Sequence, residues 1–315
     1  MTPIHYIRFR AMGCTVEAQL ETEADGTHIL SELPAAAETL EACLSRFRPE
    51  SELSRMNAVA GEWTQVSEAL FKLLVLAKNA ARLTEGLFNP LVLPALLAAG
   101  YDRSFEALQP GTSGAQTTVA DWRGIELKPE TRAVRLPVNS GIDLGGIAKG
   151  WAAQFLVEQL AAHGPAIVNL GGDIAVTGAP EGQPGWRVDI GEPGTDDDIS
   201  ATVSLKRGSI VTSATDYRRW QTTDGRTQHH IIDPRTGQPA DTDVRSATVM
   251  HPNGALADAF AKAVLLMSNE AGLRWLDAQW DAAGMIVRAD GAILATGRFT
   301  PFIVTEGETE HEITA

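Results

Sequence analysis

Segments with the apolar spacing of helices alternate with strand-like segments along almost the whole chain of 315 residues. Apolar residues recur at helical spacing in 34–47, 67–86 and 254–267, whereas strand patterns occupy 5–22 and 166–178. No internal repeat and no long linker divides the chain. We therefore expect one unit that mixes helices and strands and has enough residues for a sizeable core.

Local signals mark where several elements begin and end. Ser67 is placed to cap the helix of 67–86, and Gly86 stands where a C-terminal glycine belongs. A hairpin is predicted around Pro129. The polar stretch 47–58, which contains a proline and several capping residues, is interpreted as a loop.

The charge of the chain limits its partners. The formal net charge is −14 and the isoelectric point is about 4.9. Nucleic acids and anionic membranes bind basic faces, so neither is expected as the main partner. An anionic small ligand would need a pocket that is locally positive. The two cysteines, Cys14 and Cys43, indicate neither a disulfide framework nor a CxxC metal site.

The first fourteen residues, MTPIHYIRFRAMGC, lack the apolar run of a signal peptide. AMGC resembles a lipoprotein cleavage site only superficially, because no apolar segment precedes it. No apolar stretch is long enough to span a bilayer. These features favour the cytoplasm, with the periplasm as the alternative if the sequence has been trimmed.

The stretch 142–151, IDLGGIAKGW, places an acid, two adjacent glycines, a lysine and a third glycine before a helix pattern. A tight turn at a helix N-terminus presents free backbone N–H groups to phosphate oxygens. Asp143 would be repelled by a phosphate unless it binds a sugar hydroxyl, a base edge or a metal. The alternative is a turn that only joins a strand to a helix, since the pattern matches neither GxGxxG nor GxxxxGK[ST].

Two further stretches carry candidate charged groups. In HHIIDPRTGQP (229–239), His230 and Arg235 could act in a site if both point inward, although the same segment makes a good structural turn. In the helix pattern ALADAFAKAVLLM (255–267), Asp258 and Lys262 share one face. Such a pair is usually a surface ion pair, but this helix is apolar nearly all round, which favours a metal or an anionic ligand.

Small hydroxyl residues form the last candidate. Thr212, Ser213 and Thr215 in TSATDYRRW follow a strand pattern and precede a basic run. They could bind a ligand, or they could complete a β-turn.

The order of these motifs is more specific than any one of them. FRPESELSRMN, FNPLVLPALLAAGY, IDLGGIAKGWAAQ, IVNLGGDIAVTG, TSATDYRRW, HHIIDPRTGQP and ADAFAKA follow one another in a series that closely resembles that of the FAD:protein FMN transferases, the ApbE family. The resemblance runs from AMGCTVEAQ (11–19) to the penultimate helix. It implies an α+β fold, with one flavin transferase unit over 1–315, mixed sheets flanked by helices, and FAD held between two lobes.

The resemblance also implies a reaction. Such enzymes bind FAD and Mg²⁺, transfer the FMN half to a threonine hydroxyl of an acceptor flavoprotein, and release AMP. Some members instead hydrolyse FAD to FMN and AMP. Attack on a pyrophosphate phosphorus needs cations at its oxygens and a base for the incoming hydroxyl.

Site residues follow from the resemblance, motif by motif. His230 would lie at the reaction centre, and Mg²⁺ would be held by the Asp258 carboxylate and the Gly146 carbonyl. The residues expected around FAD are Met12, Phe47, Phe88, Asn89, Pro90, Asp143, Lys149 and Ile232.

The sequence departs from similar enzymes at Lys262, where they usually have threonine, and at Asn89, where they have aspartate. An ammonium cannot ligate a metal while it is protonated. Lys262 is therefore a candidate catalytic residue that replaces part of the metal's charge at the FAD pyrophosphate. Two alternatives stay open, namely an FAD-binding protein without Mg²⁺-dependent transfer and an FAD pyrophosphatase. The sequence identifies neither the acceptor protein nor the oligomeric state.

Overall fold

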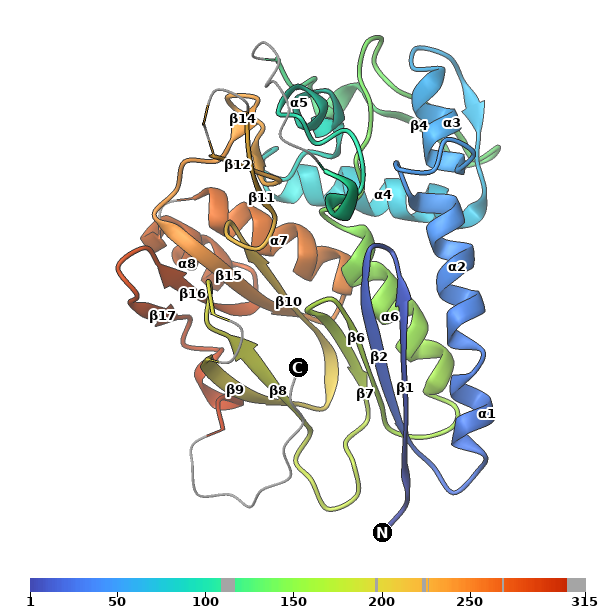
Figure 1. Ribbon diagram of the computed structural model, residues 1–315, viewed down its shortest axis with the longest axis vertical. Helices are drawn as coiled ribbons and strands as arrows, with labels where there is room; N and C mark the ends of the chain where they lie inside the picture. Colours follow the sequence, from blue (N-terminus) through green and yellow to red (C-terminus); the bar gives the residue numbers. More distant parts are fainter. Residues whose placement is uncertain (109–116, 196–197, 223–224, 226, 268, 305–315) are drawn as a thin grey trace.

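The computed structural model describes residues 1–108, 117–195, 198–222, 225, 227–267 and 269–304. Its centre is an eight-stranded sheet with the strand order β1-β2-β6-β7-β10-β15-β16-β17 (Figure 1). These strands are β1 (Ile4–Ala11), β2 (Cys14–Glu21), β6 (Ala166–Leu170), β7 (Asp173–Thr177), β10 (Arg207–Ala214), β15 (Val244–His251), β16 (Ala283–Arg288) and β17 (Ile293–Ala295).

Each face of this sheet is covered by a different kind of layer. Helices cover one face: α1 (Gly26–Leu30), α2 (Leu33–Leu44), α6 (Ala148–Leu160), α7 (Gly254–Leu266) and α8 (Asn269–Ala278) (Figure 1). The hairpin of β8 (Trp186–Gly191) and β9 (Ile199–Leu205) packs on the other face, where Trp186 and Val203 join Met285 of β16 in an apolar core. The middle of the sheet is therefore covered on both sides, with Val168 of β6 in one core and Ile167 in the other, which explains why α7 and β6 have few polar residues.

The remaining elements connect and extend this framework. They are α3 (Glu52–Ala58), β3 (Thr64–Gln65), α4 (Glu68–Leu83), η1 (Pro90–Val92), α5 (Leu93–Ala98), η2 (Phe105–Ala107), η3 (Trp122–Gly124), β4 (Glu126–Lys128), β5 (Ala133–Arg135), β11 (Arg219–Gln221), β12 (Thr227–His229), β13 (Ile232–Asp233), β14 (Gln238–Pro239) and η4 (Thr300–Phe302). None of the helices described is long and apolar enough to cross a membrane.

The α+β class is confirmed, but the expected mixed sheets are wrong. Each strand pairing among the described residues is antiparallel. For neighbours such as β1–β2 and β6–β7 the reason lies in the short connection, because a two-residue turn can join only antiparallel strands. Gly171 and Gly172 form such a turn between β6 and β7, with φ values of +63° and +93°. Two positive φ angles in succession favour glycine, which explains the Gly-Gly pair in IVNLGGDIAVTG.

The local signals identified one boundary correctly and missed one helix. The Ser67 hydroxyl accepts a hydrogen bond from the backbone N–H of Leu70 at 3.3 Å, so Ser67 caps α4 as expected. The stretch 47–58 is not a loop, since α3 occupies its second half. Only Leu53 and Met56 of this short helix are buried, so its sequence is mostly polar and resembles that of a loop.

Candidate active site

The loop before α6 is held by contacts to two distant segments. The backbone N–H of Asp143 donates to the carbonyl of Pro90 at 2.9 Å, which joins this loop to the FNP turn. The Asp143 carboxylate accepts from the N–H of Gly145 at 2.8 Å and forms an ion pair with Arg46 at 2.5 Å. Arg46 is almost fully buried, and its guanidinium lies 4.1 Å from the ring centre of Phe47 and 4.6 Å from that of Tyr101.

Two glycines bring the backbones of α6 and α7 into direct contact. A Cβ atom on Gly150 would lie 2.2 Å from the carbonyl oxygen of Gly254, and one on Gly254 would lie 2.2 Å from that of Gly150. No side chain fits at such a distance. The third glycine of IDLGGIAKG therefore serves helix packing, and it sets Asp258 of α7 against the first turn of α6.

The carboxylate of Asp258 lies at the N-terminus of α6, where a bound anion would otherwise lie. Its side chain is fully buried, and its Oδ2 faces the N–H of Gly150 at 3.4 Å. Its Oδ1 is paired with the ammonium of Lys262, which also donates to the Ser213 hydroxyl at 3.2 Å. The free N–H groups predicted for a phosphate are thus partly used by a carboxylate of the protein itself.

A second buried ion pair lies beside the first. The ammonium of Lys149 donates to Asp173 Oδ2 at 2.7 Å, and the Asp173 side chain is 1% exposed. Burial raises the pKa of Asp173 to about 6, with Lys149 and Lys262 opposing the shift and Asp258 adding to it. Burial also works against the charge of Lys149, but Asp173 and Asp258 outweigh it and raise the pKa of the ammonium.

Two adjoining cavities open around these groups. The space within the first is about 680 Å³ and that within the second about 840 Å³, counting the part that is open to solvent. They share five lining residues: Phe47, Tyr101, Asp143, Gly145 and Arg218. Lys262 and His230 line only the first cavity, and Lys149 lines only the second. One extended ligand could therefore occupy both cavities and cross between them at the shared residues.

The two neighbouring histidines have different roles. His229 is held structurally, because its Nε2 lies 2.9 Å from the Ala240 carbonyl and its Nδ1 accepts from the N–H of Ile231. His230 lines the first cavity, and its buried Nδ1 has no hydrogen-bond partner among the residues described. Burial and the nearby charges of Arg218 and Lys262 hold the pKa of His230 well below its usual range. His230 is therefore neutral near pH 7, as a general base must be.

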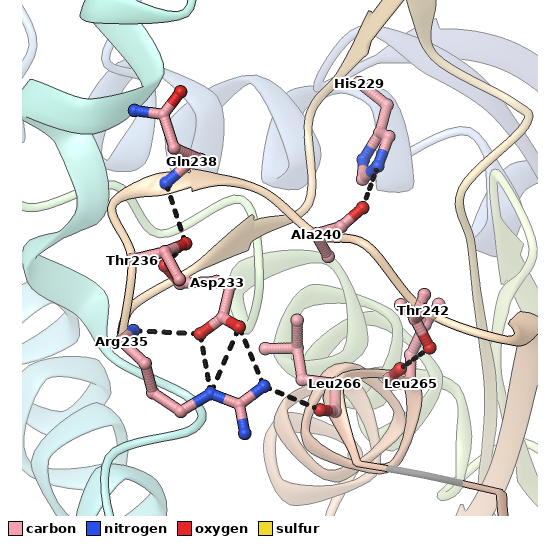
Figure 2. A network of polar contacts seen from close by, with 9 residues as sticks. All are labelled: His229, Asp233, Arg235, Thr236, Gln238, Ala240, Thr242, Leu265 and Leu266. Atoms are coloured by element: carbon pink, nitrogen blue, oxygen red, sulfur yellow. Dashed lines mark hydrogen bonds and ion pairs between the residues drawn. The ribbon is translucent and has the colours of Figure 1, made fainter. Parts of the chain in front are cut away.

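The turn that follows His230 is fastened to the C-terminus of α7 (Figure 2). Arg235 pairs with Asp233 through two nitrogens, and its Nη2 also donates to the carbonyl of Leu266 at 3.0 Å. Thr242 donates to the carbonyl of Leu265 at 2.7 Å. Arg235 is thus a structural clamp, and the expectation that it points inward together with His230 holds for His230 alone.

The structure brings most of the predicted residues to the two cavities. Those that line the first, the second or both are Met12, Phe47, Phe88, Asn89, Asp143, Gly146, Lys149, His230, Ile232 and Lys262. Pro90 and Asp258 lie behind the cavity walls and hold Asp143 and Lys262 from there. Of the three hydroxyl residues in 212–215, only Ser213 contacts the charged cluster, since Thr212 bonds to Thr248 and Thr215 to Arg245.

Sequence reasoning missed four charged or aromatic groups of the site. Tyr101 and Arg218 lie at the boundary between the cavities, Arg46 lines the second cavity and pairs with Asp143, and Asp173 pairs with Lys149. Asp173 left a signal, since an acid at the start of an apolar strand is unusual without a partner. Tyr101 and the arginines left none, because they come from three separate places, namely the residues after α2, those after α5 and the loop after β10, and only folding brings these together.

The residues present do not fit a resident Mg²⁺ ion. Mg²⁺ prefers octahedral coordination by oxygen ligands. Both oxygens of Asp258 already face donors, namely Lys262 and the N–H of Gly150. The side chain of Lys262 also passes over Gly146, where a Cβ atom would lie 2.9 Å from Lys262 Cδ.

An antiparallel sheet backed by helices, with a buried charged cluster beside two adjoining cavities, defines an α+β protein with a site suited to one extended ligand. The chain belongs to the ApbE family, whose profile matches residues 12–287.

Several relatives and solved structures are similar to this chain. A FAD:protein FMN transferase of Treponema pallidum is 34% identical, covering 82% of this chain and 76% of the relative, and one of Vibrio cholerae is 28% identical over 89% and 86%. The crystal structure of an ApbE protein from Thermotoga maritima matches 96% of this chain and 100% of its own, with a TM-score of 0.87 at 26% identity. The flavin transferase ApbE of Vibrio cholerae has the same fold, with a TM-score of 0.81 and 24% identity over 96% and 100% of the two chains.

The pair of Arg46 and Asp143 should contribute strongly to stability. Arg46→Met keeps much of the stem but leaves the carboxylate without its cation. We expect the free energy of unfolding to fall by about 2–4 kcal/mol, slightly less than for a fully enclosed pair because Asp143 faces the cavities. Arg123→Met is the matched control in urea unfolding, since Arg123 also joins an aspartate and an aromatic ring but on the surface. Equal losses for the two variants would contradict this role for Arg46.

The low pKa of His230 predicts the pH dependence of turnover. An ordinary histidine would be half protonated at about pH 6.5. Because His230 resists protonation, its own titration should leave the rate of AMP release at saturating FAD level as the pH falls through that value, and a decline near pH 6 would follow Asp173, whose pKa is raised to about 6. A decline with its midpoint at or above pH 6.5 in a stopped-time assay would show that His230 titrates as an exposed histidine.

Proposed function

We propose that this protein is an FAD:protein FMN transferase, which moves FMN from FAD to a threonine hydroxyl of an acceptor flavoprotein and releases AMP. One observation carries the proposal. The residues of the family-specific motifs, including Asp143, Lys149, His230 and Ile232, come from separate segments and meet at two joined cavities. The names of the relatives support the same activity. We also keep the single unit over 1–315 as part of the proposal.

FAD has two halves linked by a pyrophosphate, which suits two cavities that share a boundary. We place the FMN half in the first cavity, beside His230 and Ile232, and the adenylate in the second. The pyrophosphate then lies at the shared residues, where Arg218 lines both cavities. Phe47 and Tyr101, whose ring centres lie 5.7 Å apart, provide one aromatic surface beside this position. This position makes the site locally positive within a chain of net charge −14.

The chemistry follows from these positions. His230 accepts the proton of the acceptor hydroxyl as its oxygen attacks the phosphorus of the FMN half. The new oxygen–phosphorus bond replaces the bond to the bridging oxygen, and AMP leaves with that oxygen and its electron pair. Lys262 and Lys149 offset the negative charge that grows on the pyrophosphate. Because the residues do not fit a resident Mg²⁺, no step is assigned to a metal.

The experiment that tests this function separates transfer from hydrolysis. The purified protein is incubated with FAD, with and without a cell extract as a source of acceptor, and AMP and FMN are measured by chromatography. Transfer predicts AMP together with a fluorescent protein band on a denaturing gel, because the flavin is then covalently bound. AMP with an equal amount of free FMN and no such band would indicate an FAD pyrophosphatase. Absence of AMP under both conditions would refute the proposed reaction.

A further inference from the structure

Two lysine–aspartate pairs lie side by side at the base of the site. In each pair the carboxylate is buried, with Asp258 at 0% and Asp173 at 1% exposure, while the lysines are 15% and 20% exposed. Lys262 faces the first cavity and Lys149 the second. Each ammonium is thus paired with a buried carboxylate and faces one cavity, so the two ammoniums lie on opposite sides of the shared boundary.

These four groups behave as one electrostatic unit. Asp258 and Lys262 both act on the pKa of Asp173, and Asp258 also acts on that of Lys149. The unit has two positive and two negative charges, so burial of the cluster leaves no net charge uncompensated. The anchoring carboxylates also fix the ammoniums in place, which avoids the entropy loss that a mobile lysine would undergo on binding.

A divalent ion beside Asp258 would meet both ammoniums. The Oδ1 atom of Asp258, where such an ion would bind, is already paired with the ammonium of Lys262, and the methylene groups of Lys262 cover Gly146. An ion entering there would have to displace one cation from its carboxylate and approach a second. A pyrophosphate is instead attracted, because one ammonium faces each cavity on either side of the shared boundary.

We propose that Lys149 and Lys262 replace the divalent cation in this protein, so that FAD binding and release of AMP need no metal. The inference rests on the proposed function, since the pyrophosphate concerned is that of FAD. As the bond between the FMN phosphorus and the bridging oxygen breaks, the two ammoniums offset the charge gained by the departing AMP. The acceptor oxygen forms the new bond to phosphorus, and its proton passes to His230.

The first test uses the unmodified protein. After treatment with EDTA, the Kd for FAD is measured by quenching of flavin fluorescence and AMP by chromatography, in EDTA and in excess MgCl₂. We expect the same Kd and the same rate in both. Mn²⁺, used as a spectroscopic probe for Mg²⁺, should show no bound signal in electron paramagnetic resonance with or without FAD. A bound Mn²⁺ signal, or a requirement for MgCl₂, would overturn the inference.

Substitution of Lys262 should create the missing metal dependence. Lys262→Thr removes the ammonium and provides a hydroxyl oxygen that can ligate a metal. In EDTA its Kd for FAD should rise by about 10- to 100-fold, which is what the loss of one hydrogen bond to a charged group usually costs in affinity. Addition of MgCl₂ should restore part of the lost affinity. Lys72→Thr is the matched control, since Lys72 has the same i,i+4 spacing to Glu68 but lies on the surface. An effect of MgCl₂ on the control as large as on Lys262→Thr would contradict the inference.

FAD binding and AMP formation, each measured in EDTA and in MgCl₂, distinguish a metal-free site from the transfer reaction itself. If FAD binds equally well in EDTA and in MgCl₂ but no AMP forms, the metal-free site stands and the reaction is wrong. If AMP forms only with MgCl₂, the reaction stands and the metal-free site is wrong.

Discussion

Replacing His230 with alanine should lower the rate of AMP release by about 10²–10⁴-fold, the usual contribution of a positioned general base. The Kd for FAD should change little, because Arg218 and the two lysines, rather than His230, supply the positive charge that attracts the pyrophosphate. The measurement pairs a turnover assay with a fluorescence titration of FAD. A loss confined to turnover is the signature of a group that acts on the acceptor hydroxyl.

The controls for this prediction distinguish catalysis from folding. His163→Ala removes an exposed histidine at the end of α6 and should leave both turnover and Kd unchanged. The melting temperature of His230→Ala should stay close to that of the parent, because the clamp of Arg235 and Asp233 holds the turn independently of the ring. Turnover at the parent rate would make His230 a structural residue. A large rise in Kd would instead assign it to FAD binding.

A helix was predictable from the sequence where its apolar spacing and its capping residues indicate the same element. The helix α4 has an apolar stripe, a capping serine and a terminal glycine, so its pattern and its ends indicate the same element. The direction of the strand pairs was not predictable from pattern alone. For β6 and β7 it follows from the short turn Gly171-Gly172, and the strand pattern did not show that these two glycines form a hairpin turn.

The candidate site was predictable where one motif contains both the element and its functional side chain. IDLGGIAKG and HHIIDPRTG gave Asp143, Lys149 and His230 because their chemistry is concentrated in a few consecutive residues. The partners of these residues come from elsewhere in the chain. Arg46 reaches Asp143 from the end of α2, and Asp173 reaches Lys149 from β7, so only the folded sheet and helices show that the charges are paired.

Replacing Gly150 with alanine should unfold the protein or destabilise it severely. The added Cβ would lie 2.2 Å from the carbonyl oxygen of Gly254 and 3.0 Å from Asp258 Cβ, so α6 and α7 would have to separate. Both helices are buried against the central sheet and cannot move without opening the core. The expected loss is larger than the roughly 1–3 kcal/mol of ordinary overpacking, because the clash is with backbone that cannot change its rotamer.

The matched control is Gly191→Ala, since a Cβ at Gly191 meets nothing within 4 Å and its φ is not in the left-handed region. Thermal unfolding should show the Gly191 variant near the parent and the Gly150 variant far below it, or insoluble. If a folded Gly150→Ala protein can be obtained, FAD binding gives a second readout. Separation of the helices moves Asp258 and Lys262 away from Lys149, so the Kd for FAD should rise as stability falls. A Gly150→Ala protein as stable as the parent would mean that the two helices are not in backbone contact, and the placement of the charged cluster at the mouth of α6 would then be wrong.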